Sequence, residues 1–272
     1  MNETKHPFWS VIVCSINAAK FAQVTSLYER LLADRPFEII GIDDATSLCE
    51  GYNRGIAVAR GDILVFSHDD ILILDENFAD KVEARLGDDF QVLGFAGSAQ
   101  LTDGYWWASG PQHMRGAIAH AAPGDRKISL FVYGVNEAHT ERVQALDGLC
   151  LIAQRRVVEK LRFDAETFDG FHLYDLDFTF SAAQTGFNVG AMTDIPIIHM
   201  SSGGFDTVWQ AYRERFLEKH AAALNRQPNA PAPPPRALKA RAVEFRDITA
   251  LRAAWQPLYL RRATIALRRS IA

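Results

Sequence analysis

The sequence lacks any long hydrophobic run: each apolar stretch ends well short of the roughly 18 residues that a membrane-spanning helix needs. Its first residues, MNETKHPFWSVIV, show no charged region followed by a long apolar core and a cleavage site, so we expect no export signal. Cysteine is also scarce, and Cys14, Cys49 and Cys150 form no CxxC pair. This scarcity argues against a structural zinc site and predicts a cytoplasmic protein whose thiols are inert core groups.

Positive charge is sparse over most of the chain. The 272 residues carry a net charge of −4, but the nine basic and two acidic residues from Arg236 onward leave 20 basic and 31 acidic residues before it. An acidic body excludes a general nucleic-acid-binding protein, because neutralising phosphates requires clustered cations. A hydrophobic content of 48% and a charged content of 23% are typical of a folded globular chain.

The first hundred residues alternate strand-like and helix-like patterns. Apolar runs at 8–15, 37–42, 62–67 and 91–96 are separated by helical spacing at 18–32, 50–60 and 77–86. This alternation predicts an α/β domain with a mostly parallel sheet flanked by helices. Such sheets bind ligands at the carboxyl ends of their strands.

The second half is less regular. We expect extended loops, with room for a hairpin, over 98–142, and strands within 143–153 and 188–199. Helices are expected at 155–161, 174–185 and 206–225, the last with Val208, Tyr212, Phe216 and Leu217 facing inward. The Pro-rich stretch 227–236 is the clear boundary, so we divide the chain into a domain at 1–226, a linker at 227–236 and a basic helical extension at 237–272.

Polar groups follow three of the predicted strands at the point where each strand ends. Ser15 and Asn17 follow the first, Asp43 and Asp44 the second, and the segment 68–70 the third. Because parallel strands share one carboxyl edge, these side chains are expected to line a common ligand site.

Six segments, taken in order, resemble the GT-A glycosyltransferases, close to inverting family 2 and its short glycosyltransferase-like relatives. They are SVIVCSIN, IIGIDDATS, YNRGIAVARGDILVFSHDD, DGLCLIAQRRVVEKLRFD, FHLYDLDF and IIHMSSGG, within residues 8–205. The resemblance implies a Rossmann-like GT-A fold in a single domain. It also implies inverting transfer of a sugar from a nucleoside-diphosphate donor to a hydroxyl, with Mn²⁺ or Mg²⁺ as cofactor.

The segment His68-Asp69-Asp70 stands where this family has its DxD motif. A departing nucleoside diphosphate gains negative charge, which a carboxylate-held cation neutralises. Asp70 is therefore predicted as the primary metal ligand, with His68 replacing the first aspartate and favouring Mn²⁺ over Mg²⁺. By resemblance His199 completes the coordination. The alternatives are loop-capping aspartates and a purely structural histidine.

Asp175 and Asp177 lie two apart at the start of a predicted helix, so their side chains diverge by about 200° and only one can face the site. By position in the motif we predict Asp175 as the general base that deprotonates the acceptor hydroxyl. Tyr174 stands where the family has Glu. The competing interpretation is a helix-capping pair on the surface.

The resemblance also implies further donor-binding and acceptor-binding residues. A carboxylate accepts hydrogen bonds from uracil N3–H or ribose hydroxyls, so a UDP-sugar fits, and indole faces stack on sugar rings. The predicted donor-binding residues are Ser15, Asn17, Asp43, Asp44, Asn53, Arg60, Asp69 and Asp147. The predicted acceptor-binding residues are Trp106, Trp107 and His113, whose alternative is a hydrophobic lid.

The basic tail admits two interpretations. Its mixture of apolar and basic residues suits a helix lying on an anionic membrane surface, which would serve a lipid-linked acceptor. It equally suits packing on the acidic body or on a second subunit.

We therefore predict a cytoplasmic transferase acting on a glycan or lipid-linked acceptor, as in surface-polysaccharide assembly, with possible peripheral membrane contact. The non-enzymatic alternative is a degenerate GT-A binding or scaffold module, which the departures at His68 and Tyr174 keep open. A nucleotidyltransferase is disfavoured because INAAKF, after the first strand, lacks a Gly-rich basic phosphate loop.

Overall fold

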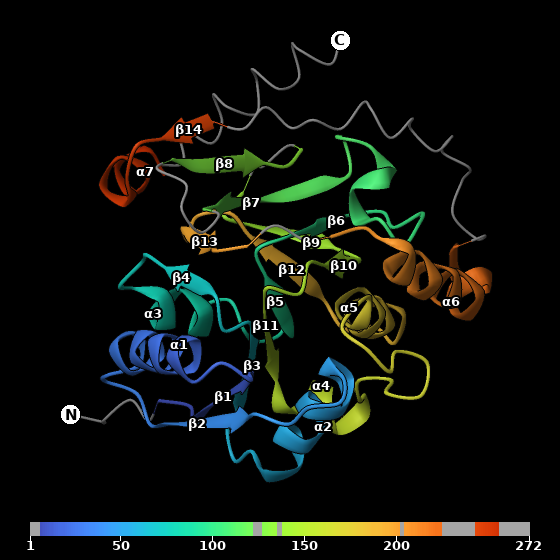
Figure 1. The fold of residues 1–272 in the computed structure, drawn as a ribbon, viewed down its shortest axis with the longest axis horizontal. Helices are drawn as coiled ribbons and strands as arrows, with labels where there is room; N and C mark the ends of the chain where they lie inside the picture. Colours follow the sequence, from blue (N-terminus) through green and yellow to red (C-terminus); the bar gives the residue numbers. More distant parts are fainter. Residues whose placement is uncertain (1–5, 122–126, 135–137, 202–203, 225–242, 256–272) are drawn as a thin grey trace.

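A computed structural model describes residues 6–121, 127–134, 138–201, 204–224 and 243–255. The fold contains two sheets. Helices flank the first sheet, and the second lies next to the end of the first (Figure 1). Among the described residues no helix is both long and apolar enough to cross a membrane.

The first sheet has seven strands in the order β2-β1-β3-β11-β5-β12-β9. The pairs of β1 with β2 and β3, and of β5 with β12, are parallel, whereas β11 runs against both of its neighbours and β9 runs against β12. Five of the seven strands thus run in one direction, as the prediction of a mostly parallel sheet requires, and β11 and β9 run against them. The chain enters β11 from a turn instead of from a crossover helix. The strands are β1 (Trp9–Cys14), β2 (Phe37–Ile42), β3 (Ile63–Ser67), β5 (Val92–Gly94), β9 (Thr140–Val143), β11 (Cys150–Gln154) and β12 (Val189–Met192).

Helices cover both faces of this sheet, with α1 and α3 on one side and α2, α4 and α5 on the other (Figure 1). Their bounds are α1 (Ala18–Leu31), α2 (Leu48–Val58), α3 (Phe78–Glu83), α4 (Arg155–Lys160), α5 (Tyr174–Gln184) and α6 (Thr207–Leu224). The core between sheet and helices includes Phe66, Phe163 and Phe178, with the last two rings stacked 4.2 Å apart. Such aromatic burial fixes α5 against β3.

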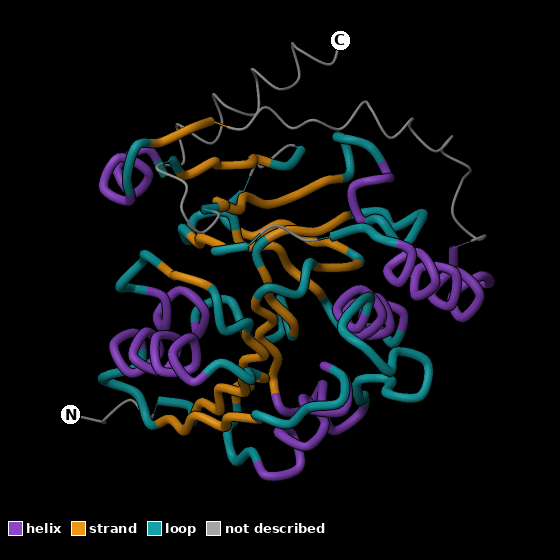
Figure 2. Tube along the Cα trace, viewed as in Figure 1, coloured by secondary structure: helices purple, strands orange, loops and turns teal. Residues whose placement is uncertain are grey.

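The second sheet occupies much of the region where we expected loops (Figure 2). Its strands follow the order β10-β6-β7-β13-β4, and β7 also pairs with β8, which pairs with β14. They are β4 (Ile71–Ile73), β6 (Ala96–Ser98), β7 (Met114–His120), β8 (Ile128–Val132), β10 (Ala145–Leu146), β13 (Ile197–His199) and β14 (Val243–Phe245). The hairpin allowed for within 98–142 is confirmed, since β7 and β8 pair antiparallel. The extent of the loops was overestimated, because short strands with long-range partners leave little periodicity in the sequence.

Part of the predicted C-terminal extension packs on the body. β14 extends the second sheet, and α7 (Ile248–Ala254) follows it. Leu251 and Trp255 are buried beside Leu130 and Ile198, and the Trp255 indole N–H donates to the Thr193 carbonyl at 3.1 Å. The linker at 227–236 and the rest of the extension lie outside the described residues.

Helix α6 buries the face that the sequence predicts, except at its first turn. Trp209 and Phe216 are buried, whereas Val208 is 54% exposed, which corrects the inward position expected for Val208. Tyr212 and Leu217 are partly buried against the core, as expected.

Candidate metal centre

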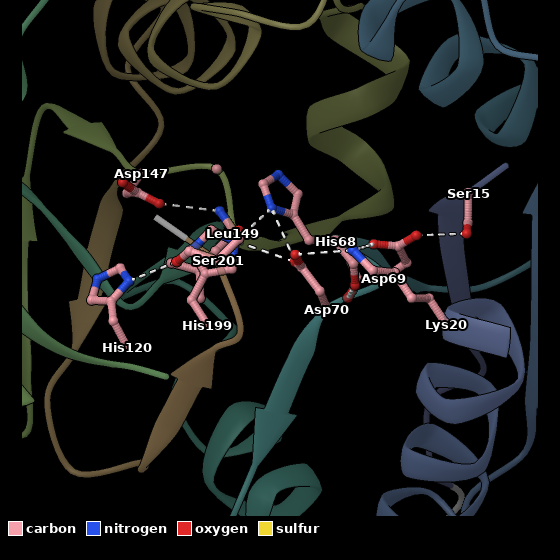
Figure 3. A network of polar contacts seen from close by, with 12 residues as sticks. Ser15, Lys20, His68, Asp69, Asp70, His120, Asp147, Leu149, His199 and Ser201 are labelled. Atoms are coloured by element: carbon pink, nitrogen blue, oxygen red, sulfur yellow. Dashed lines mark hydrogen bonds and ion pairs between the residues drawn. The ribbon is translucent and has the colours of Figure 1, made fainter. Parts of the chain in front are cut away.

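Three metal-ligating side chains converge where the two sheets meet. His68 and Asp70 lie between β3 and β4, and His199 ends β13, which pairs with β4. His68 Nδ1 lies 3.3 Å from His199 Nε2, and Asp70 Oδ1 lies 3.2 Å from His199 Nε2 and 4.0 Å from His68 Nδ1 (Figure 3). The convergence depends on the pairing of β4 with β13, since these residues are far apart in sequence.

The three atoms have the spacing and chemistry of a divalent-cation site. They lie within 4.8 Å of one another. A point equidistant from the three lies about 2.1 Å from each, which is the usual length of a bond from a histidine nitrogen or carboxylate oxygen to a transition-metal ion. Two imidazoles and one carboxylate suit Mn²⁺ better than Mg²⁺, because Mg²⁺ prefers oxygen ligands.

The electrostatics keep Asp70 ionised and His68 neutral. Burial alone would raise the pKa of Asp70, but its hydrogen bond with His199 and the electrostatic attraction of neighbours that include Lys20 hold that pKa below its usual range. Burial and the nearby His199 lower the pKa of His68 to about 4. A carboxylate and a neutral imidazole are the forms that bind metal ions.

Two groups support His199 from the side of the second sheet. The Ser201 hydroxyl lies 3.0 Å from His199 Nε2, and the Ser201 carbonyl accepts from His120 Nδ1 at 3.0 Å (Figure 3). His120 lies opposite His199 in the pairing of β7 with β13, and burial lowers its pKa. These contacts hold the end of β13 at the site.

On the other side, α1 brings a cation to the cluster. The Lys20 ammonium lies 3.4 Å from Asp70 Oδ2 and 3.7 Å from Asp69 Oδ1, and its side chain is 46% exposed. The Ser15 hydroxyl donates to Asp69 Oδ2 at 2.6 Å. Asn17 caps α1, because its Oδ1 accepts from the backbone N–H groups of Ala19 and Lys20. The predicted donor residues Ser15 and Asp69 therefore lie beside the metal cluster, and Asn17 places Lys20 there.

The start of α5 supplies the acidic pair. Leu173 precedes the helix in the left-handed conformation, with φ of 59°, and is the one described residue other than glycine with positive φ. Gly148 lies against this turn, where an added Cβ would come 2.6 Å from the Asp175 Cβ and would clash with the Tyr174 hydroxyl. The strained turn and the missing side chain let Tyr174 and Asp175 lie against the turn at Gly148.

The two carboxylates of this pair point in different directions, as their spacing predicts. Burial, and then the nearby carboxylate of Asp147, raise the pKa of Asp175 to about 7. Asp177 instead faces α6, where it lies 2.7 Å from Lys219 Nζ and accepts from His220 Nε2 at 2.7 Å. Of the two, Asp175 alone has the environment of a general base that works near neutral pH.

Asp147 lies in the turn between β10 and β11. Its Oδ1 accepts from the backbone N–H of Leu149 at 3.2 Å, and its Oδ2 accepts from the Trp106 indole at 3.4 Å (Figure 3 shows the former). The Leu149 carbonyl in turn accepts from the His68 backbone N–H at 3.0 Å. Hydrogen bonds through Leu149 therefore link Asp147 to His68, one of the three candidate metal ligands.

Two predicted donor residues are placed elsewhere. Arg60 pairs with Glu38 near the amino ends of β1 and β2, at 2.8 Å, so it lies at the edge of the sheet opposite the cluster. The Asn53 amide donates to the Phe163 carbonyl at 2.7 Å and accepts from the Phe163 N–H at 3.1 Å. We correct both assignments. Arg60 follows helix α2, which returns the chain to the edge of the sheet where the parallel strands begin. The oxygen and the nitrogen of the Asn53 side chain are both used in hydrogen bonds that hold α2 to the backbone of Phe163.

Asp43 and Asp44 are exposed at the carboxyl end of β2, and Asp44 pairs with Arg54 at 2.5 Å. This edge is the same one that bears Ser15. The position is compatible with the predicted contact to a base or ribose. Asp43 is the freer of the two carboxylates, because it forms no ion pair within the part of the chain that the structure describes. We keep both as candidates.

The predicted acceptor residues differ in exposure. Trp106 is buried and packs on Trp107 and Tyr133, so its faces are not available for stacking, which corrects its role to that of a support for Asp147. Trp107 is half-buried and contacts Phe205, which is 50% exposed. His113 is half-buried in the loop before β7, and burial lowers its pKa.

Sequence reasoning missed two residues of the site, Lys20 and His120, and one contact, which Tyr174 makes with His68. Lys20 carried a usable signal, because it lies in the first turn of a helix that follows a nucleotide-binding strand pattern. His120 had none, since its place beside His199 depends on the pairing of β7 with β13. Tyr174 Oη lies 2.8 Å from His68 Nε2, a contact that no local pattern encodes.

Comparison with known proteins identifies the class. The sequence profile of the glycosyltransferase-like family matches residues 10–220, and the chain therefore belongs to this family. The comparison with curated proteins returned no match. These results make the protein a member of a transferase family and confirm the resemblance noted in its sequence motifs.

Similar solved structures include GalNAc-T7 with UDP, GalNAc and Mn²⁺, at a TM-score of 0.52 and 9% identity, covering 79% of this chain and 48% of that one. Mannosyltransferase PcManGT from Pyrobaculum calidifontis, in complex with GDP-Man and Mn²⁺, gives a TM-score of 0.49 at 14% identity, covering 98% of this chain and 75% of that one. This chain spans about half the length of GalNAc-T7. The likeness to GalNAc-T7 confirms the predicted α/β GT-A fold.

Proposed function

We propose that the protein is a metal-dependent, inverting glycosyltransferase that moves a sugar from a nucleoside-diphosphate donor to a hydroxyl group. The observation that carries this proposal is the convergence of His68, Asp70 and His199, with His68 Nε2 2.8 Å from the hydroxyl of Tyr174, the residue that precedes Asp175. These three residues would hold a divalent cation, and the cation would supply neutralisation of charge on the departing diphosphate.

The chain itself supplies a second positive charge. Lys20 Nζ contacts Asp70 and Asp69 through an exposed side chain, so it can turn toward a diphosphate bound at the cluster without disturbing the fold. Ser15 keeps Asp69 in place through its 2.6 Å hydrogen bond. We assign Lys20 to binding the donor diphosphate and Asp69 to orienting Lys20.

Asp175 would act as the general base. A pKa of about 7 lies near the operating pH, which is the condition for an effective base, and the ionised form accepts the proton of the acceptor hydroxyl. The acceptor oxygen then forms the new bond to the anomeric carbon as the diphosphate departs from the opposite face. A single displacement of this kind inverts the anomeric configuration.

The proposed donor and acceptor are assigned from residues around the three candidate metal ligands. Asp43 and Asp44 at the end of β2 suit hydrogen bonds with uracil or ribose, so we assign a UDP-sugar donor. Trp107, with Phe205, and His113 offer partly exposed rings to a glycan or lipid-linked acceptor. Surface-polysaccharide assembly on the cytoplasmic side of a membrane is the setting that such an acceptor implies.

The test is a panel of nucleotide sugars incubated with the full chain, with Mn²⁺ or with a chelator, while nucleoside diphosphate release is measured. We expect release with at least one donor, highest for a UDP-sugar, and its loss in the chelator. NMR of a transferred product should show an anomeric configuration opposite to that of the donor. Nucleotide binding without turnover of any donor would instead favour a non-enzymatic binding module.

A further inference from the structure

The two departures from the family motifs touch each other. His68 replaces the first aspartate of the DxD motif and Tyr174 replaces the glutamate before Asp175, and Tyr174 Oη lies 2.8 Å from His68 Nε2. The same hydroxyl lies 3.1 Å from the carbonyl oxygen of Gly148. Tyr174 is 4% exposed, so protein groups dominate its hydrogen bonding. The two substitutions therefore form one hydrogen-bonded unit.

Counting protons fixes the direction of each hydrogen bond. A phenol has one proton, and a carbonyl oxygen can only accept, so Tyr174 satisfies the Gly148 carbonyl by donating to it. The phenol oxygen, which also has the Tyr52 hydroxyl as a hydrogen-bond partner, then accepts from His68, which places the imidazole proton on Nε2. Nδ1 is left with its lone pair, and Nδ1 is the atom that lies 3.3 Å from His199 Nε2 and 4.0 Å from Asp70 Oδ1.

The opposite tautomer is disfavoured by the same contacts. With its proton on Nδ1, His68 would need the phenol to donate to Nε2, and the Gly148 carbonyl would lose that donor in a buried setting. The Nδ1 proton would also point at the position that a cation must occupy. One phenol thus decides which nitrogen of His68 is free to bind a metal ion.

We propose that Tyr174 is a positioning residue that holds His68 as an Nδ1 metal ligand, so that the His68–Tyr174 pair does the work of a carboxylate ligand. The proposal rests on the cation site of the proposed function. A histidine ligand commonly donates its second N–H to a carboxylate, carbonyl or water, and here a phenol relays that hydrogen bond to a backbone carbonyl.

The surroundings hold the phenol rigidly. Tyr174 starts α5 directly after the left-handed Leu173, and its ring packs against Tyr52 and Phe163 at 5.8 and 6.3 Å between centroids. Gly148 leaves the space in which the hydroxyl lies. A side chain fixed in this way sets the ring orientation of His68 as well as its tautomer.

The first test reads the tautomer without any substitution at Tyr174. Imidazole ¹⁵N shifts of the metal-free protein at pH 7, with the His68 signals assigned by their loss in His68→Gln, should show protonated Nε2 and unprotonated Nδ1. Signals showing Nδ1–H would overturn the proposal.

The second test measures Mn²⁺ affinity by the loss of the free-ion EPR signal. Tyr174→Phe should weaken binding by about 10-fold or more, the usual cost of losing such a partner. Tyr28→Phe, which removes a buried hydroxyl beside Cys150, is the matched control and should bind as the wild type does. In a His68→Ala background, Tyr174→Phe should have no further effect.

The results separate this inference from the proposed function. Unchanged Mn²⁺ affinity in Tyr174→Phe, or a wild type that binds no Mn²⁺, overturns the inference, whatever the donor assay shows. Weakened Mn²⁺ binding that depends on His68, in a protein that turns over no nucleotide sugar, supports the inference and refutes the transferase proposal.

Discussion

Two acidic centres lie near the first turn of α5, one half-buried around Asp70 and one buried around Asp177, and they differ in what neutralises them. Asp177 is 2% exposed and lies 2.7 Å from both Lys219 and His220 of α6. Asp70 contacts His199 directly, but Lys20 lies 3.4 Å away on a side chain that is 46% exposed. The first centre is satisfied within the fold, whereas the second keeps a carboxylate and two imidazoles directed at one point.

The difference shows that neighbouring carboxylates on one helix can have different roles, one in stability and one in catalysis. Asp175 and Asp177 share the first turn of α5, but burial and the nearby Asp147 raise the pKa of Asp175, while Asp177 pairs with Lys219 of α6. A carboxylate with fixed cationic partners holds elements together, and one without them is available for proton transfer. Substitutions at the two centres should therefore separate activity from stability.

The largest effect is expected for Asp70→Ala. Loss of the carboxylate leaves two imidazoles and removes the charge that holds a cation, so donor turnover should fall by at least about 10³-fold. Mn²⁺ binding measured by EPR should disappear while the thermal unfolding temperature stays close to that of the wild type. Asp88→Ala, an exposed residue before the amino end of β5, is the control and should change neither quantity. Full activity in Asp70→Ala would refute the metal role.

Asp175→Asn should be the next most damaging to catalysis. Asparagine keeps the size but cannot take up a proton, so kcat should fall by about 10²- to 10⁴-fold, the usual contribution of a general base. Mn²⁺ affinity should be unchanged, because Asp175 is not one of the three candidate metal ligands His68, Asp70 and His199. A comparable loss of Mn²⁺ binding would show that the two roles are not separate.

Asp177→Ala should act on stability instead. Removing the carboxylate leaves Lys219 and the buried His220 without this partner, and the free energy of unfolding should fall by about 3 kcal/mol. Asp164→Ala, which removes the other partner of Lys219 from a more exposed position, should cost less. Urea denaturation gives both values, and Mn²⁺ affinity below the transition should stay at the wild-type level. An Asp177→Ala variant with the wild-type free energy of unfolding would contradict a structural role for the Asp177 centre.

The smallest predicted effect is a pH dependence. Because the pKa of Asp175 is raised to about 7, the fraction of ionised base falls as pH is lowered, and kcat/KM should drop about tenfold per unit below pH 7. His68, with a pKa near 4, stays neutral over this range and does not produce the decline. Initial rates from pH 5.5 to 9 provide the profile, and a flat profile would contradict the base assignment.

Local patterns predicted the first half of the fold well. The expected segments at 18–32, 37–42 and 62–67 correspond to α1, β2 and β3 within a residue at each end. Continuous apolar strands and amphipathic helices carry that information in neighbouring residues. The antiparallel β11 and the second sheet were not predicted, because their strands are short and pair with distant segments.

The site was predicted in part for the same reason. The order of motifs placed His68, Asp70 and His199 together, and the spacing of Asp175 and Asp177 placed them on different sides of a helix. The crossover geometry could have excluded Arg60, since a helix that follows a strand returns the chain to the amino edge.

What the sequence could not supply are contacts between distant elements. The hydrogen bond of Tyr174 to His68 depends on how α5 packs beside β3. The place of His120 beside His199 depends on the pairing of two strands in the second sheet. Both require tertiary structure, and neither leaves a periodic signal.

The most direct test of the central claim is a crystal of the full chain grown with Mn²⁺ and UDP, examined for anomalous scattering. The account predicts a single strong peak bonded to His68 Nδ1, Asp70 Oδ1 and His199 Nε2, at about 2.1 Å from each. A manganese peak bound elsewhere, or these three side chains without a peak at saturating Mn²⁺, would contradict it.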